Sequence, residues 1–252
     1  MAAITVVTGA AGALGRAVLA TLTERGDTVV ALDRASAALD ALGSTVAETD
    51  RAGAAPDTLG RATGTPGPDV DGVGRIHPIG VDLADRGSVL DAWKRVDEVG
   101  APTGLVALAG GFTPGKLADL DEDTFTGLWE GNVSTLLWSA QQAASRMPRG
   151  SSIVTVGSKT AVTGKAPVGH AASKAAVVRV TELLADELRP AGIRVNTVLP
   201  SVLDTPANRS WMSPDLVAKA VSTAAVAKVI AFLLSDDASP ISGARIPVYG
   251  DA

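Results

Sequence analysis

His170 and Lys174 stand four residues apart in the stretch VGHAASKAAV, which runs from Val168 to Val177. Four residues make about one helical turn, so both side chains project from the same face of a helix. An imidazole can take up or release a proton near neutral pH, and an ammonium group close to it lowers its pKa. The pair therefore has the composition of an acid/base dyad. The alternative is that the same spacing places a half-buried histidine beside a solvated lysine, with no chemical role.

A second chemical feature is the glycine-rich stretch TGAAGALG near the N-terminus. Its glycines recur every three residues, between an apolar run expected to be a strand and an alanine-rich segment expected to be a helix. Backbone N–H groups in such a turn can approach a pyrophosphate at the helix N-terminus. Glycine triplets also serve ordinary tight turns, but this position between strand and helix indicates a dinucleotide site. The candidate contacts in the turn are Thr8, Gly9, Gly12, Ala13, Leu14 and Gly15.

An acidic residue, Asp33, ends the next apolar run, VVALD, 18 residues beyond Gly15. A carboxylate at this place can accept hydrogen bonds from the adenosine ribose hydroxyls and repels a 2′-phosphate, which favours NAD(H). Arg34 follows it directly and can hold that phosphate, so NADP(H) stays possible. The alternative is that Asp33 and Arg34 only end a strand in a polar turn.

Composition narrows the range of partners. Of the 252 residues 46% are hydrophobic, and the mean hydropathy is +0.25, so a substantial core can form. The net charge is -5 and no cluster of Lys and Arg stands out, which argues against nucleic acid and for a small-molecule partner. No apolar run reaches the roughly 18 residues of a membrane span, and the first residues lack a basic region typical of a signal peptide. We therefore expect no membrane partner and a cytoplasmic location. Cysteine is absent, and we name no metal ligand.

Segments rich in Val and Ile alternate with alanine-rich helical segments, which predicts βαβ units and a parallel sheet. We expect an α/β fold, a single doubly wound Rossmann-type domain over residues 1–252, with a sheet of about seven strands covered by helices on both faces. The expected strands are residues 3–9, 27–33, 74–82, 104–110, 151–158, 192–200 and 244–250, and the expected helices are 13–26, 122–147 and 170–192.

One segment interrupts this alternation. Residues 44–75 are rich in Gly and Pro and poor in large apolar side chains. Such a connection is typical of an insertion that is either a mobile excursion or a functional lid.

Taken in order, these motifs resemble those of the short-chain dehydrogenase/reductase family over essentially the whole chain outside residues 44–75. TGAAGALG is similar to the family's glycine-rich turn, and VDLAD to the segment whose aspartate lies near the adenine. EGNVSTLLWSAQ is similar to the helix with the active-site asparagine, SSIVTVGS to the strand that ends in the catalytic serine, and GIRVNTVLPSVLDTP to the strand and loop that flank the nicotinamide. The resemblance implies catalytic roles for Asn132, Ser158 and Lys174, and cofactor contacts at Asp82, Leu83, Ala109, Gly110, Lys174, Pro200, Leu203 and Thr205.

Within that family the chain is most similar to dihydropteridine reductases. The similar segments are GALG, VALAGGFTPG, VGSKTAVTG and VLPSVLDTPANRSWM. Most family members carry the sequence NNAG where this chain has ALAG, with Ala107 and Leu108. This difference removes a polar residue from the end of a strand.

The resemblance fails at the family's acid/base, because His170 occupies the position of the tyrosine in Tyr-x-x-x-Lys. The only tyrosine is Tyr249 near the C-terminus, and Ser158 precedes His170 by twelve residues, one fewer than usual. Beside an ammonium group a histidine is mostly neutral at pH 7, which makes it a competent base and a poor proton donor. Imidazole is also shorter than phenol by roughly 2 Å, which threatens direct contact with a substrate.

We therefore expect an NAD(P)-dependent oxidoreductase that transfers hydride between nicotinamide and a carbonyl, an imine or a quinonoid dihydropterin-like substrate. Ser158 would polarise the acceptor, Lys174 would hold the ribose, Asn132 would anchor a water, and His170 would relay the proton. A quinonoid dihydropterin suits this site because its reduction needs little help from an enzymic acid. One alternative keeps the nucleotide but performs non-redox chemistry, as a cyclase or isomerase does, and another only binds.

Three large side chains and two helices give expectations for the substrate and for an oligomer. Phe112, Trp211 and Met212 lie in segments expected to wall the substrate side, which suggests an apolar or flat aromatic ligand, although they suit a core or an interface equally well. The resemblance also implies a homo-oligomer, a dimer or tetramer, formed through the helices that contain Asn132 and Lys174.

Overall fold

Strands buried on both faces form the centre of the protein. The computed structural model describes residues 3–43 and 74–251, and its first two strands, ITVVT and TVVALD, are buried along most of their length. Such continuous apolar strands are expected where helices cover both faces of a sheet. The strands are β1 (Ile4–Thr8), β2 (Thr28–Asp33), β3 (Ile76–Gly80), β4 (Gly104–Ala107), β5 (Ser152–Val156), β6 (Arg194–Pro200), β7 (Leu203–Asp204), β8 (Val221–Ser222) and β9 (Arg245–Val248).

Seven of these strands make one sheet in the order β3-β2-β1-β4-β5-β6-β9. All its pairs are parallel; Val7, for example, pairs with Ala31 of β2 on one side and Val106 of β4 on the other. The direction of strand addition reverses between β1 and β4, and such a reversal opens a crevice at the carboxyl ends of the strands. The predicted Rossmann-type parallel sheet is therefore confirmed.

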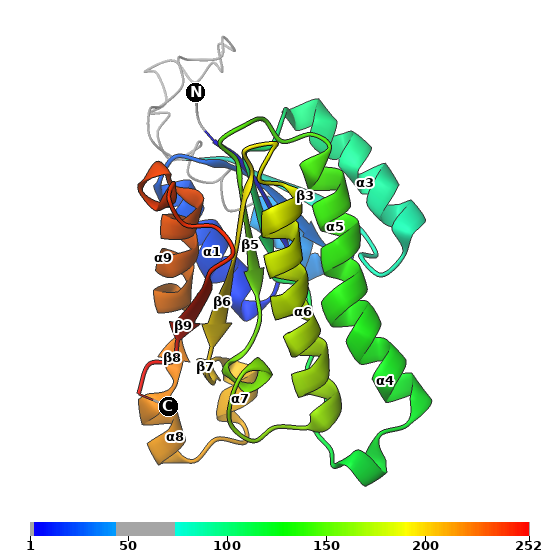
Figure 1. Ribbon diagram of the computed structural model, residues 1–252, viewed down its shortest axis with the longest axis vertical. Coiled ribbons are helices and arrows are strands. Elements are labelled where there is room, and N and C mark those ends of the chain that lie inside the picture. Colours follow the sequence, from blue (N-terminus) through cyan, green and yellow to red (C-terminus); the bar gives the residue numbers. More distant parts are fainter. Residues whose placement is uncertain (1–2, 44–73, 252) are drawn as a thin grey trace, which may run out of the picture.

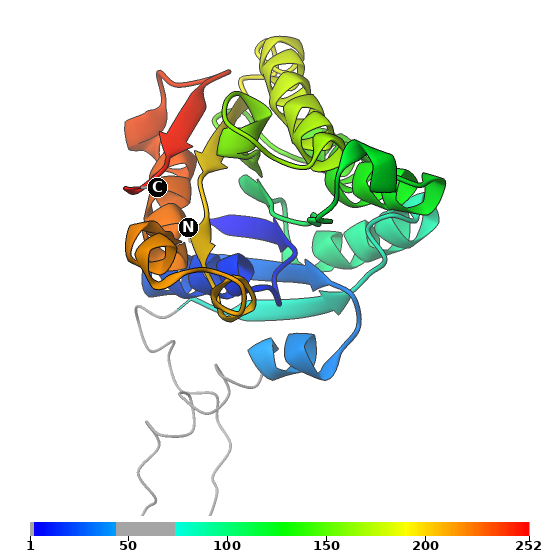
Figure 2. The ribbon, with the colours of Figure 1, turned by 90° about the horizontal axis from the view of Figure 1, so that it is seen from below.

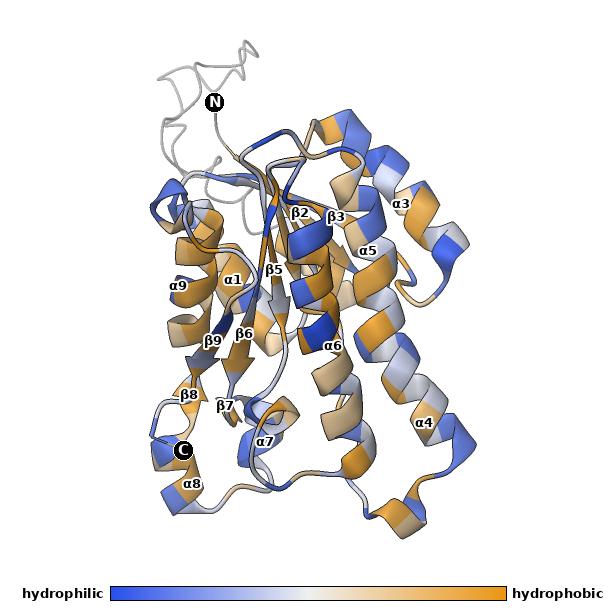
Figure 3. Ribbon diagram, in the orientation of Figure 1, coloured by the Kyte–Doolittle hydropathy of each residue, from blue (hydrophilic) through white to orange (hydrophobic). Residues whose placement is uncertain are grey.

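Two layers of helices enclose the sheet (Figures 1 and 2). α1 and α9 pack on one face in a cluster that includes Leu19 and Ile230, while α3, α5 and α6 pack on the other around Trp93. α9 is apolar over most of its length (Figure 3), as its burial against the sheet requires. The helices are α1 (Ala13–Glu24), α3 (Arg86–Val99), α4 (Glu122–Trp129), α5 (Thr135–Ala144), α6 (Val168–Glu187), α7 (Pro206–Arg209), α8 (Pro214–Lys219) and α9 (Thr223–Leu234), and residues 37–43 are also helical.

Two helix predictions need correction. The helix expected over residues 122–147 is interrupted by a π-helical turn, Glu130–Ser134, and ends at Ala144. The helix expected over residues 170–192 begins at Val168 and ends at Glu187, because Pro190 cannot continue it and Gly192 adopts a left-handed φ of 72°. The predicted insertion at 44–75 lies outside the described residues except for Gly74 and Arg75. No helix in the described ranges is both long and apolar enough to cross a bilayer.

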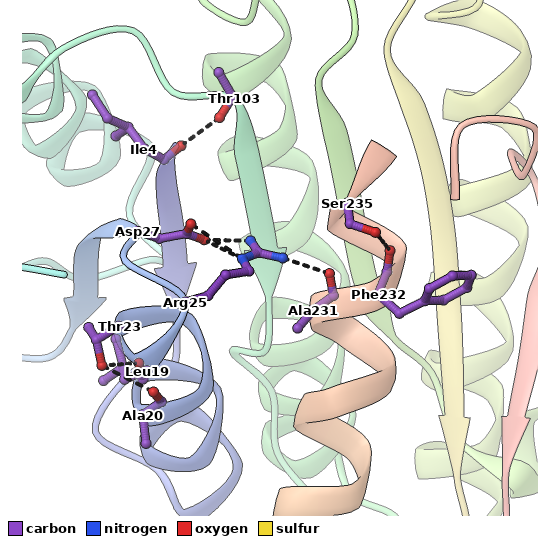
Figure 4. Close-up of polar contacts among 10 residues, drawn as sticks. All are labelled: Ile4, Leu19, Ala20, Thr23, Arg25, Asp27, Thr103, Ala231, Phe232 and Ser235. Carbon is purple, nitrogen blue, oxygen red and sulfur yellow. Dashed lines mark hydrogen bonds and ion pairs between the residues drawn. The ribbon is translucent and has the colours of Figure 1, made fainter. Parts of the chain in front are cut away.

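A charged side chain connects the C-terminal end of α1 to the C-terminal part of α9 (Figure 4). The guanidinium of Arg25, at the end of α1, donates through Nε and Nη2 to the carboxylate of Asp27 and through Nη1 to the carbonyl of Ala231 in α9, at 2.8 Å. Asp27 is only 5% exposed. A buried carboxylate needs such a partner, since an unpaired one carries a large desolvation penalty.

We expect Arg25→Ala to lower the free energy of unfolding by about 1–3 kcal/mol, because Asp27 would keep a buried charge without its donor and α9 would lose its link to α1. Urea denaturation measures this. The matched control is Arg189→Ala, since Arg189 pairs with Asp186 and both side chains are exposed; we expect no measurable change there. Equal losses in the two variants would show that the Arg25 link contributes nothing specific.

Candidate active site

The glycine-rich turn after β1 has no room for a side chain at Gly9 or Gly15. Gly9 has a left-handed φ of 68°, and a Cβ added to it would lie 2.9 Å from the backbone nitrogen of Ala109. A Cβ on Gly15 would lie 2.3 Å from the carbonyl oxygen of Gly9. Thr8 joins the same strand ends, because its Oγ1 accepts hydrogen bonds of 3.2 Å from the N–H groups of Leu108 and Ala109. The turn is thereby held directly against the segment that follows β4.

A cleft of about 680 Å³ opens beside this turn, at the reversal point of the sheet. Of the predicted cofactor contacts, those on its walls are Gly9, Gly12, Ala13, Leu14, Gly15, Asp33, Arg34, Asp82, Leu83, Ala109, Gly110, Leu203 and Thr205. Thr8, Lys174 and Pro200 lie outside this lining. The cleft is also lined by residues that the sequence motifs did not indicate, most of which are chain neighbours of motif residues: Ala11, Val81, Ala84, Leu108, Gly111, Gly131 and Thr135.

The carboxylate of Asp33 is held at one edge of the cleft. Its Oδ2 accepts a hydrogen bond of 2.9 Å from the N–H of Ala11, and its Oδ1 accepts one of 2.8 Å from the N–H of Arg34. Arg34 itself is exposed. Because each carboxylate oxygen has two lone pairs, Asp33 can still accept hydrogen bonds from a ligand in the cleft.

Asn132 lies in the π-helical turn between α4 and α5 and is buried. Its Oδ1 accepts from the N–H of Gly111 at 3.0 Å, and its Nδ2 donates to the carbonyl of Gly111 at 3.1 Å and to Oγ of Ser173 at 3.0 Å. π-Helical turns often occur at functional sites. Here the turn carries an amide that binds the segment after β4 to α6.

Lys174 stands behind the wall that Gly110 forms. A Cβ on Gly110 would lie 2.5 Å from Oδ1 of Asn132 and 3.2 Å from Nζ of Lys174. Nζ donates to the carbonyl of Val156 at 3.0 Å. Burial lowers the pKa of Lys174 to about 8, so the ammonium form still predominates at pH 7 but gives up its proton more readily than that of an exposed lysine. The structure thus brings Asn132 and Lys174 together behind Gly110, although neither of them lines the cleft.

Ser158 follows the carboxyl end of β5 and begins the short 3₁₀ turn Lys159–Ala161. Its Oγ accepts from the N–H of Thr160 at 3.2 Å and shares a hydrogen bond of 2.8 Å with Oγ1 of Thr160. Within the described residues no hydrogen bond joins Ser158 to His170.

The imidazole of His170 lies away from the cleft lining and instead borders a smaller cavity of about 40 Å³. Its ring meets that of Phe112 edge-on, with centroids 4.9 Å apart. Burial lowers the pKa of His170 and the charge of Lys174 lowers it further, while the backbone carbonyl of Gly111 acts in the opposite direction. The imidazole is therefore mainly neutral at pH 7.

The other expected wall residues lie in different surroundings. Phe112 and Trp211 are exposed, and Met212 is buried. None of the three lines the cleft. No group of three potential metal ligands occurs within residues 3–43 and 74–251.

Known proteins resemble the chain over most of its length. A family model described as enoyl-(acyl carrier protein) reductase matches residues 37–250. The 3-oxoacyl-[acyl-carrier-protein] reductase FabG of Thermotoga maritima is 28% identical over 264 residues, covering 98% of this chain and 96% of its own, and the reductase MabA of Mycobacterium bovis is 34% identical over 184 residues, covering 67% and 73%. The crystal structure of a blue fluorescent protein from a metagenomic library, in complex with NADPH, has a TM-score of 0.83 at 27% identity and covers 99% of this chain and 97% of its own.

The lowered pKa of Lys174 predicts a pH dependence of stability. The unfolded chain keeps the ordinary value of 10.5, so between pH 8 and 10.5 it binds more protons than the folded protein, and Lys174 costs less stability as the pH rises. Relative to Lys174→Met, the parent should therefore gain on the order of 1–3 kcal/mol between pH 7 and 10, measured by urea denaturation. The exposed Lys228 provides the control: Lys228→Met should differ from the parent equally at both pH values. A constant difference for Lys174→Met would contradict the lowered pKa.

Proposed function

Because this chain belongs to the short-chain dehydrogenase/reductase family, we propose that it is an NAD(P)-dependent oxidoreductase that acts on a carbonyl, imine or quinonoid carbon of a small molecule. One observation carries this function. The glycine turn, Asp33 and Gly110 line the same cleft. The ammonium group of Lys174 and the amide of Asn132 lie behind Gly110. The nucleotide-binding end and the chemical end of a dehydrogenase site thus share one space.

The cleft fits a dinucleotide. Its volume of about 680 Å³ lies within the range of cofactor sites, and the bare backbone at Gly9 and Gly15 leaves N–H groups open to a pyrophosphate at the start of α1. When bound, the nicotinamide supplies or accepts the hydride. Pro200, Leu203 and Thr205 would flank its ring, while Asp82 and Leu83 would lie against the adenine.

NAD(H) is the preferred form of the cofactor in this proposal. The carboxylate of Asp33 is held by two backbone N–H groups at the edge of the cleft, where it repels a 2′-phosphate. NADP(H) stays the alternative because Arg34 adjoins it, and because the similar blue fluorescent protein is described in complex with NADPH.

Four side chains would serve the chemistry. The hydroxyl of Ser158 would polarise the acceptor, and Lys174 would hold the nicotinamide ribose and keep the local field positive. Asn132 would fix the segment after β4 and anchor a water. His170, mainly neutral, would relay the proton and would limit reductions that need a strong acid.

This weak acid favours a substrate that needs little protonation during hydride transfer, such as a quinonoid dihydropterin. The FabG and MabA relatives are named for 3-oxoacyl substrates, so a 3-oxoacyl thioester belongs in the same panel. A ketone reports best on the acid, because its oxygen must be protonated.

A second candidate function is nucleotide binding without redox turnover. It is favoured by the position of His170, whose ring borders the smaller cavity while the hydroxyl of Ser158 is bonded to Thr160. A cyclase or isomerase that retains its cofactor unchanged, or a protein that only binds, would have this arrangement.

NADH oxidation between pH 5 and 8 decides between these functions. We expect the protein to reduce quinonoid dihydropterin, and to reduce a ketone faster toward acidic pH, because the lowered pKa of His170 leaves little imidazolium at pH 7. His170→Tyr should raise the ketone rate at pH 7 by about tenfold or more, since a longer side chain with a tunable phenol replaces the imidazole. NADPH measured in parallel should be the poorer cofactor.

The control is His77→Gln, which changes the only other histidine, on β3, and should leave the pH profile unchanged. If NADH binds, the parent reduces nothing, and His170→Tyr alone reduces ketones, then the fold has been diverted from reduction and the second candidate function holds.

The same proposal includes a homo-oligomer, a dimer or tetramer, formed through α4, α5 and α6. In Figure 1 α4 and α5 follow one another end to end and α6 lies beside them, and each of the three exposes a large apolar side chain, Phe125, Leu137 and Leu183 respectively. Contiguous exposed apolar surface is typical of protein interfaces.

We expect light scattering to give a dimer or tetramer mass. A charge in an apolar interface is costly, so Leu183→Glu and Phe125→Glu should each raise the dissociation constant of the oligomer by about tenfold or more. Leu90→Glu, on α3, provides a control at a similarly exposed leucine. A monomer mass for the parent would contradict the proposal.

A further inference from the structure

The smaller cavity lies between the segment after β4 and the first turn of α6, beside α4. Its volume is about 40 Å³. The segment contributes Thr113, Lys116 and Leu117 to its wall, α4 contributes Thr124, and α6 contributes Val168 and His170. A water needs roughly 10–15 Å³ of such space, so the cavity can hold a small number of water molecules and excludes larger ligands.

One residue of this wall, His170, carries a buried polar atom without a partner among the described residues. His170 is 8% exposed, and its Nδ1 has no hydrogen-bond partner in the described part of the chain. A buried ring nitrogen without a partner costs free energy that one hydrogen bond recovers. The ring of Phe112, which packs edge-on against the imidazole, offers it no hydrogen-bond acceptor or donor group, whereas the cavity has room for water.

The imidazole also adjoins the wall of the cofactor cleft. Gly111 lines that cleft, and its backbone carbonyl interacts with His170. Lys174, whose Nζ lies behind Gly110, is close enough for its charge to affect the imidazole. The ring thus stands between the cleft, where a substrate would react, and a cavity that opens beside the exposed Val168 and Leu117.

We propose that the smaller cavity is a water site that supplies protons to His170 from the side opposite the cofactor cleft. This inference rests on the proposed oxidoreductase function. During reduction the substrate carbon gains a hydride, and its oxygen or nitrogen gains a proton from the imidazole ring. In the neutral ring Nε2 carries the proton, and Nδ1 takes one from water in the cavity as the Nε2 proton passes to the substrate, so each turnover consumes one solvent proton. The ring then holds its proton on Nδ1. After product release it gives that proton back to the cavity water while Nε2 takes one from water in the cleft, which restores His170.

Charged groups on the neighbouring elements set the working range of this supply. Lys174 faces the imidazole from its own helix, and the segment after β4 presents Lys116 and Asp119 to the cavity. Asp119 is engaged locally, because its Oδ2 accepts from the N–H of Lys116 at 2.9 Å. α4 presents only the uncharged Thr124 and Leu128. Asp119 is therefore the one carboxylate among the described residues of the cavity wall, and its Oδ1 can still accept a hydrogen bond from water there.

Val168→Trp tests the proposal, because Val168 lines the cavity, is 54% exposed, and offers space for a large side chain that closes it. Val162→Trp is the matched control, since Val162 is 43% exposed and lines neither space. Nitrogen-15 NMR of the imidazoles is the direct readout: the chain has two histidines, and His77→Gln assigns them. We expect the His170 ring proton to exchange with water in the parent and in Val162→Trp, and about tenfold more slowly or more in Val168→Trp.

Turnover provides the second readout. Val168→Trp should lower the ketone reduction rate by about tenfold while NADH affinity stays unchanged, and Val162→Trp should change neither. Equal ring-proton exchange in the two tryptophan variants, or no water contact at His170 in the parent, would overturn the proposal. If the NMR results are as expected but no variant oxidises NADH, the proposed oxidoreductase function fails and the relay fails with it, while the water site itself stands.

Discussion

The site depends on the close approach of two backbone segments at the reversal point of the sheet. The turn after β1 and the segment after β4 lie so near each other that a Cβ on Gly9 would meet the backbone of Ala109. The hydroxyl of Thr8 strengthens this contact, because its Oγ1 accepts hydrogen bonds from the N–H groups of Leu108 and Ala109. Because backbone and not side chains forms this junction, N–H groups remain at the surface of the cleft, where a phosphate can reach them. Larger residues at these glycines would close the space that the rest of the architecture creates.

A series of hydrogen bonds connects this junction to α6, and it begins at Gly111, next to Gly110. These residues continue the segment after β4, and Asn132 holds Gly111 through both its N–H and its carbonyl. The same amide donates to Ser173, whose Oγ donates to the carbonyl of His170. A single chain of hydrogen bonds therefore connects the cleft wall, the π-helical turn and the first turn of α6. It also explains why the long helix predicted over residues 122–147 is interrupted, since the wider turn directs Asn132 inward.

Electrostatics at this end of the site follows from burial and not from ion pairs. Lys174 has a carbonyl as its hydrogen-bond partner, and burial lowers its pKa to about 8. His170 is buried beside it and its pKa is lowered too. A neutral imidazole beside a charged ammonium group is a competent base and a poor proton donor.

Local sequence was sufficient for much of this description. The glycine spacing, Asp33 at the end of its strand and the apolar runs predicted the sheet and the part of the cleft lining that the turn after β1 and the end of β2 form, because each depends on backbone geometry within a short stretch of chain. The resemblance supplied Asp82, Leu83, Ala109, Gly110, Leu203 and Thr205. The positions of Asn132 and Lys174 were predicted by resemblance, but their contacts with Gly110 and Gly111 join elements far apart in sequence.

The orientation of His170 was decided by tertiary structure alone. The spacing to Lys174 placed both residues on one face of a helix, yet His170 lines the smaller cavity and not the cleft, and Phe112 packs against its ring. Residue type and helical period determine which groups can meet, whereas the direction of a short side chain depends on the space that distant segments leave.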